Sequence, residues 1–139
     1  MKALHNLVRV HRWQLDEKRR QFAQLEKLRG DLGRQEAKLA VEMAAEQEAA
    51  AKAGAAATTY PAYVQEARAR QKRVADSIAE VERQMLTAQQ EIAEAYAEVK
   101  KYETALSHME KRETAKRERT QRIAQDELAI DMHRRKKSG

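Results

Sequence analysis

Apolar residues recur at alternating three- and four-residue intervals through the second half of the chain. The repeat runs from Val64 to Met109, and among its positions only Gln71 is polar. A repeat sustained over about six heptads, with charged residues between, is typical of one seam of a left-handed coiled coil. The predicted seam of this helix includes Val74, Ile78, Val81, Met85, Ile92, Val99 and Leu106.

The first half of the chain carries the same spacing in a weaker form, from Leu4 to Met43. Several of its seam positions are charged or histidine, and its apolar centre consists of Leu25, Leu32 and Leu39. Alanine then dominates residues 44–57, which gives a narrow helix with little side-chain bulk. Because of its charged seam positions and its alanine-rich end, we expect this first helix to pack loosely against the second.

One break separates the two patterns, at residues 58–61, where Pro61 follows two threonines and a tyrosine. Proline suits the first turn of a new helix and keeps the preceding residue out of the helical region. The sequence predicts one all-α domain: helix one at about 3–57, a turn at about 58–60, helix two at about 61–133, and a basic tail at 134–139. A turn this short makes the two helices antiparallel, so the expected fold is a long two-helix coiled coil, or helical hairpin.

The position of the turn predicts which residues face each other. With the turn centred near residue 59, residue i faces roughly residue 118 − i. Leu25 is then expected near Ile92 and Leu39 near Ile78, and helix one ends opposite about residue 114. Helix two is expected to overhang its partner beyond that point.

Composition agrees with a coiled coil rather than a globular core. Of 139 residues, 36% are charged and 4% are aromatic, with four Gly and one Pro. Such a balance is typical of long helices. Because there is no cysteine, disulfides, thiolate metal sites and cysteine nucleophiles are excluded. We read no signal peptide and no apolar run of membrane-spanning length, and we expect a soluble cytoplasmic protein.

The sequence offers little for catalysis. No two of the four histidines are four residues apart, the spacing that would place two metal ligands on one helix face. The expected register does bring His11 near His108. That pair could bind a metal or respond to pH, or could be two partly buried seam histidines. There is no glycine-rich phosphate loop, and a two-helix coiled coil offers no cavity to exclude water. We expect a protein that is not an enzyme and uses no cofactor, metal or small molecule.

The net charge of +6 is unevenly distributed. Residues 1–20 hold six Lys/Arg and two Asp/Glu, residues 110–139 hold ten and six, and residues 21–109 hold twelve and fourteen. Near the basic N-terminus, Trp13 falls on an outward position with Arg9, Arg12 and Arg20 around it. An exposed Trp among Arg residues has the composition of an interface hot spot; the alternative is a Trp lying along its own helix under Arg side chains.

The C-terminal part is the second candidate contact surface. Its apolar residues have nothing in helix one to cover them, so they are expected to form a strip that binds a partner, or to belong to a frayed end. The partner-binding candidates here are Arg119, Arg122, Ile123, Leu128, Ile130 and Met132. The basic run 134–137 is either a solvated end or a contact for phosphates or acidic protein. We expect no nucleic acid partner, because aromatic interleaving and a recognised module are absent.

The chain resembles the FliJ family of flagellar type III export proteins. The resemblance rests on the opening MKALHNLVRVHRW, the charged stretch LDEKRR at 15–20 and the ending LAIDMHRRK at 128–136. It covers nearly the whole chain, and the related YscO-type proteins of injectisomes remain an alternative. Members of the family are non-enzymatic coiled coils similar in shape to the two-helix stalk of the rotary ATPase gamma subunit.

The resemblance implies a stalk or connector in protein export and motility. The open end of the hairpin would sit in the hexameric export ATPase, another part would reach the membrane export gate, and empty export chaperones would be further partners. The expected location is the cytoplasmic face of the inner membrane. Two other hypotheses remain: a basic coiled coil that binds nucleic acid, and a structural protein that self-assembles through its C-terminal strip.

Overall fold

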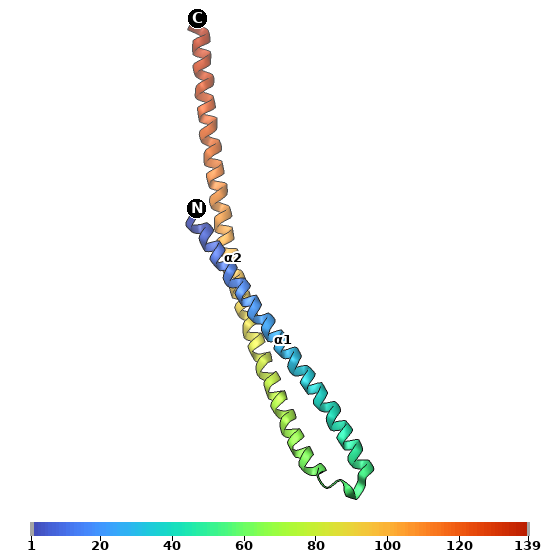
Figure 1. Ribbon diagram of the computed structural model, residues 1–139. Helices are drawn as coiled ribbons and strands as arrows, with labels where there is room; N and C mark the ends of the chain where they lie inside the picture. The colour runs from blue at the N-terminus through green and yellow to red at the C-terminus, as the bar shows by residue number, and fades with distance from the viewer. Residues whose placement is uncertain (1, 139) are drawn as a thin grey trace. The chain divides into compact units, whose positions relative to one another are not determined.

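The computed structural model describes residues 2–138, which form two long helices, α1 (Lys2–Ala53) and α2 (Tyr60–Ser138), joined by a short turn (Figure 1). A single turn of 3-10 helix, η1 (Gly54–Ala56), lies between them. No strand occurs in the described part of the chain. The predicted all-α helical hairpin is therefore confirmed.

The turn begins earlier than the sequence indicated. α1 ends at Ala53 rather than near residue 57, because Gly54 adopts a left-handed backbone conformation with φ of 59°. Glycine takes this conformation without a Cβ clash and commonly terminates helices. Two backbone hydrogen bonds close the turn, from Ala57 N–H to the Gly54 carbonyl at 3.1 Å and from Thr58 N–H to the Ala56 carbonyl at 2.9 Å.

α2 begins at Tyr60 with Pro61 in its first turn, close to the predicted start. It remains helical through Ser138, so residues 134–138, predicted as a separate tail, continue the helix. Gly30 and Gly33 lie inside the unbroken helix α1.

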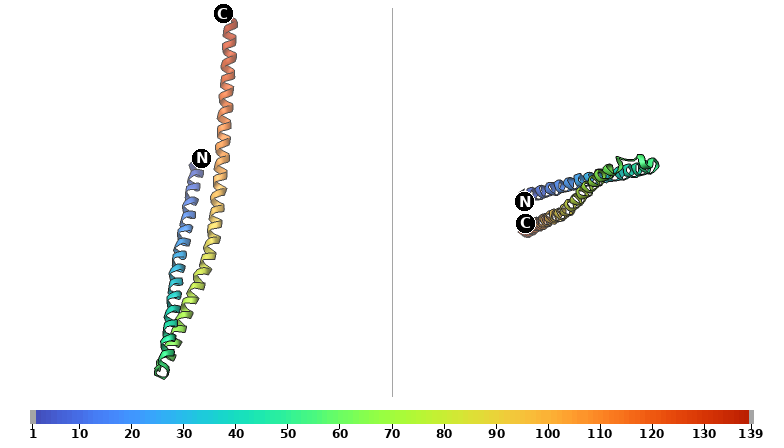
Figure 2. Two further views of the ribbon diagram at one scale, coloured as in Figure 1. Left: turned by 90° about the vertical axis from the view of Figure 1, so that its right-hand side faces the viewer. Right: turned by 90° about the horizontal axis from the view of Figure 1, so that it is seen from below.

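The contacts divide the chain into two units. Unit 1 combines Met1–Trp13 with Tyr96–Gly139, and unit 2 is Gln14–Ala95. In unit 2 the two helical stretches lie side by side and antiparallel, joined at the turn (Figure 1 and Figure 2). Its buried residues come from the heptad positions of both stretches: Leu15, Leu39, Ala67, Ile78, Val81 and Ala88.

In unit 1, Val8 of α1 and Val99 of α2 are each 3% exposed. Of the remaining predicted seam residues, Leu25, Leu32, Val74, Met85, Ile92 and Leu106 are half-buried. The structure thus places all ten predicted seam residues among the buried or half-buried positions. Only partial burial is possible for many of them, since two helices cover each other from one side.

Cross-helix contacts correct the predicted register. Arg29 Nε lies 2.9 Å from Glu82 Oε1 in unit 2, where the predicted partner is residue 89. Arg12 Nε lies 3.2 Å from Glu103 Oε1 in unit 1, where the predicted partner is residue 106. The partners come earlier because the midpoint between Ala53 and Tyr60 lies near residues 56–57, not at 59.

Candidate partner-binding surfaces

The described N-terminal part of α1 exposes an apolar band on its outer side. Trp13 is 61% exposed, Val10 49% and Leu7 41%. Trp13 therefore points outward as its heptad position predicted, and most of its side chain is exposed. Leu7 and Val10 were missed in the sequence, although their spacing of three residues to each other and to Trp13 was a readable signal.

The arginines assigned to this surface have different surroundings. Arg12 donates from Nε to Glu103 at 3.2 Å within unit 1, and Arg20 pairs with Glu17 in unit 2. Arg9 has no ion pair within residues 2–138. The Arg12 hydrogen bond, with a further contribution from Lys100, holds the pKa of Glu103 below its ordinary value.

His11 does not approach His108 as the predicted register required. It stacks on Tyr102, with ring centroids 4.5 Å apart, while His108 is exposed. His5 Nε2 lies 3.7 Å from Glu110 Oε1. Among the described residues no group of three or more His, Cys, Asp or Glu side chains is arranged to hold a metal ion.

The C-terminal part of α2 forms the second surface. The last half-buried side chain is Glu113, and every side chain from 114 to 138 is exposed. Arg119 and Arg122 lie on this exposed stretch. Helix two therefore overhangs its partner from nearly the predicted residue, and it does so as a helix.

The four apolar residues of this stretch do not form the single strip that was expected. Ile123 and Ile130 are seven residues apart and share the face that continues the seam. Leu128 and Met132 are four residues apart and share another face, about 160° away on a helix of 100° per residue. All four are more than half exposed. The tail therefore offers apolar contacts on two nearly opposite sides.

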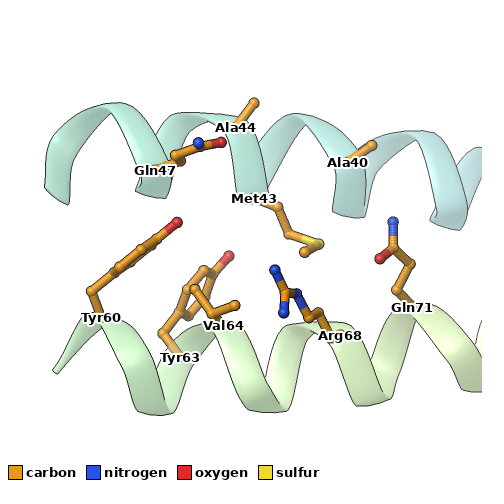
Figure 3. A pocket seen from close by; sticks show the side chains of 9 residues that line it. All are labelled: Ala40, Met43, Ala44, Gln47, Tyr60, Tyr63, Val64, Arg68 and Gln71. Carbon is orange, nitrogen blue, oxygen red and sulfur yellow. The ribbon is translucent and has the colours of Figure 1, made fainter. Parts of the chain in front are cut away.

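A groove in unit 2 was not foreseen. Met43 projects from α1, and Tyr60, Tyr63 and Arg68 project from α2, into an open space of about 290 Å³ between the helices (Figure 3). Its other lining residues are Ala40, Ala44, Gln47, Val64 and Gln71. The alanines of α1 leave this space unfilled, which agrees with the looser pairing expected there.

Partial burial, followed by the nearby carboxylates Glu46 and Glu42, raises the pKa of Tyr63 in this groove. The hydroxyl is therefore neutral over the ordinary pH range, and its polar end faces the groove with Arg68 and Gln71. Such a lining suits a partner side chain with both apolar and hydrogen-bonding parts.

Comparison with known proteins gives no relative. No family model matches the chain, and neither the curated proteins nor the solved structures yielded a match. In the described residues, neither helix contains a stretch that is both long enough and apolar enough to span a bilayer.

Proposed function

We propose that this protein is a non-enzymatic stalk or connector of a type III export apparatus, whose α2 tail inserts into the central channel of the hexameric export ATPase. The proposal takes its partner from the FliJ resemblance. The observation that carries it is the overhang of α2, in which every side chain of residues 114–138 is exposed and apolar side chains lie on two nearly opposite faces.

Contacts on opposite faces favour a partner that surrounds the helix. A helix that docks on one flat surface needs a single apolar stripe. In the tail, Ile123 and Ile130 would instead contact one side of a channel and Leu128 and Met132 the other. Arg122, between the two faces, and Arg119, on the face of Ile123 and Ile130, would meet acidic groups of the channel wall.

The remainder of the proposal follows the resemblance. Another part of the coiled coil binds the membrane export gate, so the protein lies at the cytoplasmic face of the inner membrane. Empty export chaperones are further partners. No residues are assigned to those contacts. Because the YscO-type proteins of injectisomes remain an alternative, the proposal applies to a flagellar or an injectisome apparatus.

Deleting residues 115–139 tests the tail directly. Binding to the purified export ATPase should be lost, while circular dichroism should still show a helical protein. A truncated protein that binds with unchanged affinity would rule out the tail as the ATPase contact.

Two double variants of the full chain test whether the tail is surrounded. Ile123→Glu with Ile130→Glu, and Leu128→Glu with Met132→Glu, should each weaken ATPase binding by tenfold or more, roughly 1.4 kcal/mol. Leu86→Glu, at an exposed site in unit 2, is the matched control and should leave binding unchanged. If only one double variant weakens binding, the tail docks on one side and insertion is wrong.

A second candidate function is supported by the charge distribution. Unit 1 contains fifteen Lys/Arg and eight Asp/Glu, whereas unit 2 contains thirteen and fourteen. An excess of seven positive charges in one unit could bind nucleic acid. Titration with duplex DNA and RNA tests nucleic-acid binding. Micromolar affinity that falls steeply with salt would favour this function, and the absence of binding near physiological salt would rule it out.

A further inference from the structure

The exposed band of Leu7, Val10 and Trp13 has no role in the tail contact. On a helix, residues three apart are rotated by about 60° from one to the next, so the three side chains form a continuous band. The band avoids the side of α1 that carries Val8, which is buried in unit 1. This part of α1 therefore has two apolar faces: one is buried in the coiled coil, and the other, the band, is exposed.

The charges beside this band are positive and partly uncompensated. Residues 2–13 of α1 include Lys2, Arg9 and Arg12 and no Asp or Glu. Arg12 pairs with Glu103, but the described residues provide no ion-pair partner for Lys2 or Arg9. Both lie on the Trp13 side of the band, within about 40° of it around the helix axis.

We propose that this band lies on the surface of an anionic lipid bilayer. Tryptophan favours the membrane–water interface, and Lys and Arg beside an apolar face can extend their charged ends to lipid headgroups. A cationic border and the absence of carboxylates from residues 2–13 of α1 complement a negatively charged surface. This contact uses α1 alone and does not depend on the ATPase proposal.

Trp13 is the only tryptophan and reports directly on the proposed contact. The probe is a phosphatidylcholine vesicle containing about 30% phosphatidylserine, which supplies the anionic surface potential. With the full chain, Trp13 emission should shift to shorter wavelength and be quenched by lipids brominated on their acyl chains. Pure phosphatidylcholine vesicles should give no shift, and added salt should reverse the binding.

Single variants test which residues of the band contact the vesicle. Val10→Gln and Arg9→Glu should each reduce the vesicle-bound fraction at least tenfold in partition coefficient, measured by co-sedimentation. Two exposed residues of unit 2 give matched controls, Leu86→Gln for the apolar change and Arg73→Glu for the charge change, and both should bind as the parent chain does. Circular dichroism checks that all four remain helical.

Three results would overturn the proposal. One is co-sedimentation without a Trp13 shift, which would assign binding to another basic segment such as 134–137. Another is equal binding to neutral vesicles or by the Arg9 and Val10 variants. The third is a Trp13 shift with the purified ATPase and none with vesicles, which would make the band a protein contact.

The Ile123→Glu/Ile130→Glu variant should keep its vesicle binding, which separates failure of this inference from failure of the ATPase proposal.

Discussion

At the level of single residues, four contacts between a basic side chain and a glutamate join the two helices within the described residues. His5 and Arg12 pair with glutamates of α2 in unit 1, and Lys18 and Arg29 do so in unit 2. In each of these four contacts the basic side chain is on α1. Exposed pairs of this kind add little stability, but they disfavour pairing of α1 with a second α1, which would bring like charges together. They therefore favour the hairpin over a parallel pairing of identical helices.

The Arg12–Glu103 pair gives a prediction at this scale. Because the folded-state pKa of Glu103 is lowered, its contribution to stability is present above the ordinary pKa and is lost as pH falls through the lowered value. The acid-sensitive window is therefore below about pH 4. Arg12→Ala should raise the pKa of Glu103 toward its ordinary value in an NMR titration of the side-chain carboxyl. Arg9→Ala is the control; a Glu103 pKa that moves equally in both variants would contradict the assigned cause.

Burial within the seam gives a second prediction. Leu39 is 5% exposed, whereas Val41 on the same helix is 70% exposed. Leu39→Ala should lower the free energy of unfolding by about 2 kcal/mol, because it removes buried methyl groups and leaves a cavity. Val41→Ala should change it by less than about 0.5 kcal/mol. Urea titrations followed by circular dichroism measure both, and equal effects would show that Leu39 does not contribute to the seam.

At the level of the helices, the sequence predicted the pairing face well and the turn less well. The heptad spacing identified Ile78, Val81 and Val99 as seam residues because a coiled coil buries one face with a fixed period. Pro61 located the start of α2 to within one residue. The end of α1 was placed late because alanines continue past Gly54 and favour helix, so only the left-handed glycine marks the end.

The candidate surfaces, too, could be predicted from the sequence only in part. The outward position of Trp13 follows from heptad position, so it could be read from the sequence. The separation of Ile123 and Ile130 from Leu128 and Met132 also follows from helix geometry, but it required the tail to be helical. The groove beside Tyr63 could not be predicted, because its volume depends on how closely an alanine-rich helix approaches its partner.

The glycines provide a prediction for α1 and its end. Gly54→Ala should lower the free energy of unfolding by about 1 kcal/mol, because alanine is strained at a positive φ. Gly30→Ala should raise it by about the same amount, since Gly30 is helical and an added Cβ would make an ordinary contact with the Arg34 guanidinium at 3.6 Å. Thermal unfolding by circular dichroism measures both. Opposite signs are required, and a stabilising Gly54→Ala would contradict the assigned helix end.

For the whole molecule, burial and charge are distributed in opposite ways. Unit 2 contains most of the buried seam residues and is nearly neutral, whereas unit 1 contains Val8, Val99 and the excess positive charge. Like charges close together oppose compaction, and few buried contacts offset that cost. The chain thus combines a nearly neutral unit that holds most of the buried seam with a basic unit that has few buried side chains.

Hydrogen exchange should show this division along the chain. Amides of α2 near Ile78, Val81 and Ala88 should exchange slowly, because these residues are buried against α1 in unit 2. Protection should fall beyond residue 113, where every side chain to 138 is exposed and the helix has no tertiary packing. If the tail binds the export ATPase as proposed, adding that ATPase should slow exchange selectively at 114–138. Slow exchange of that segment in the free protein would show that it already packs against a second copy, and would support self-assembly instead.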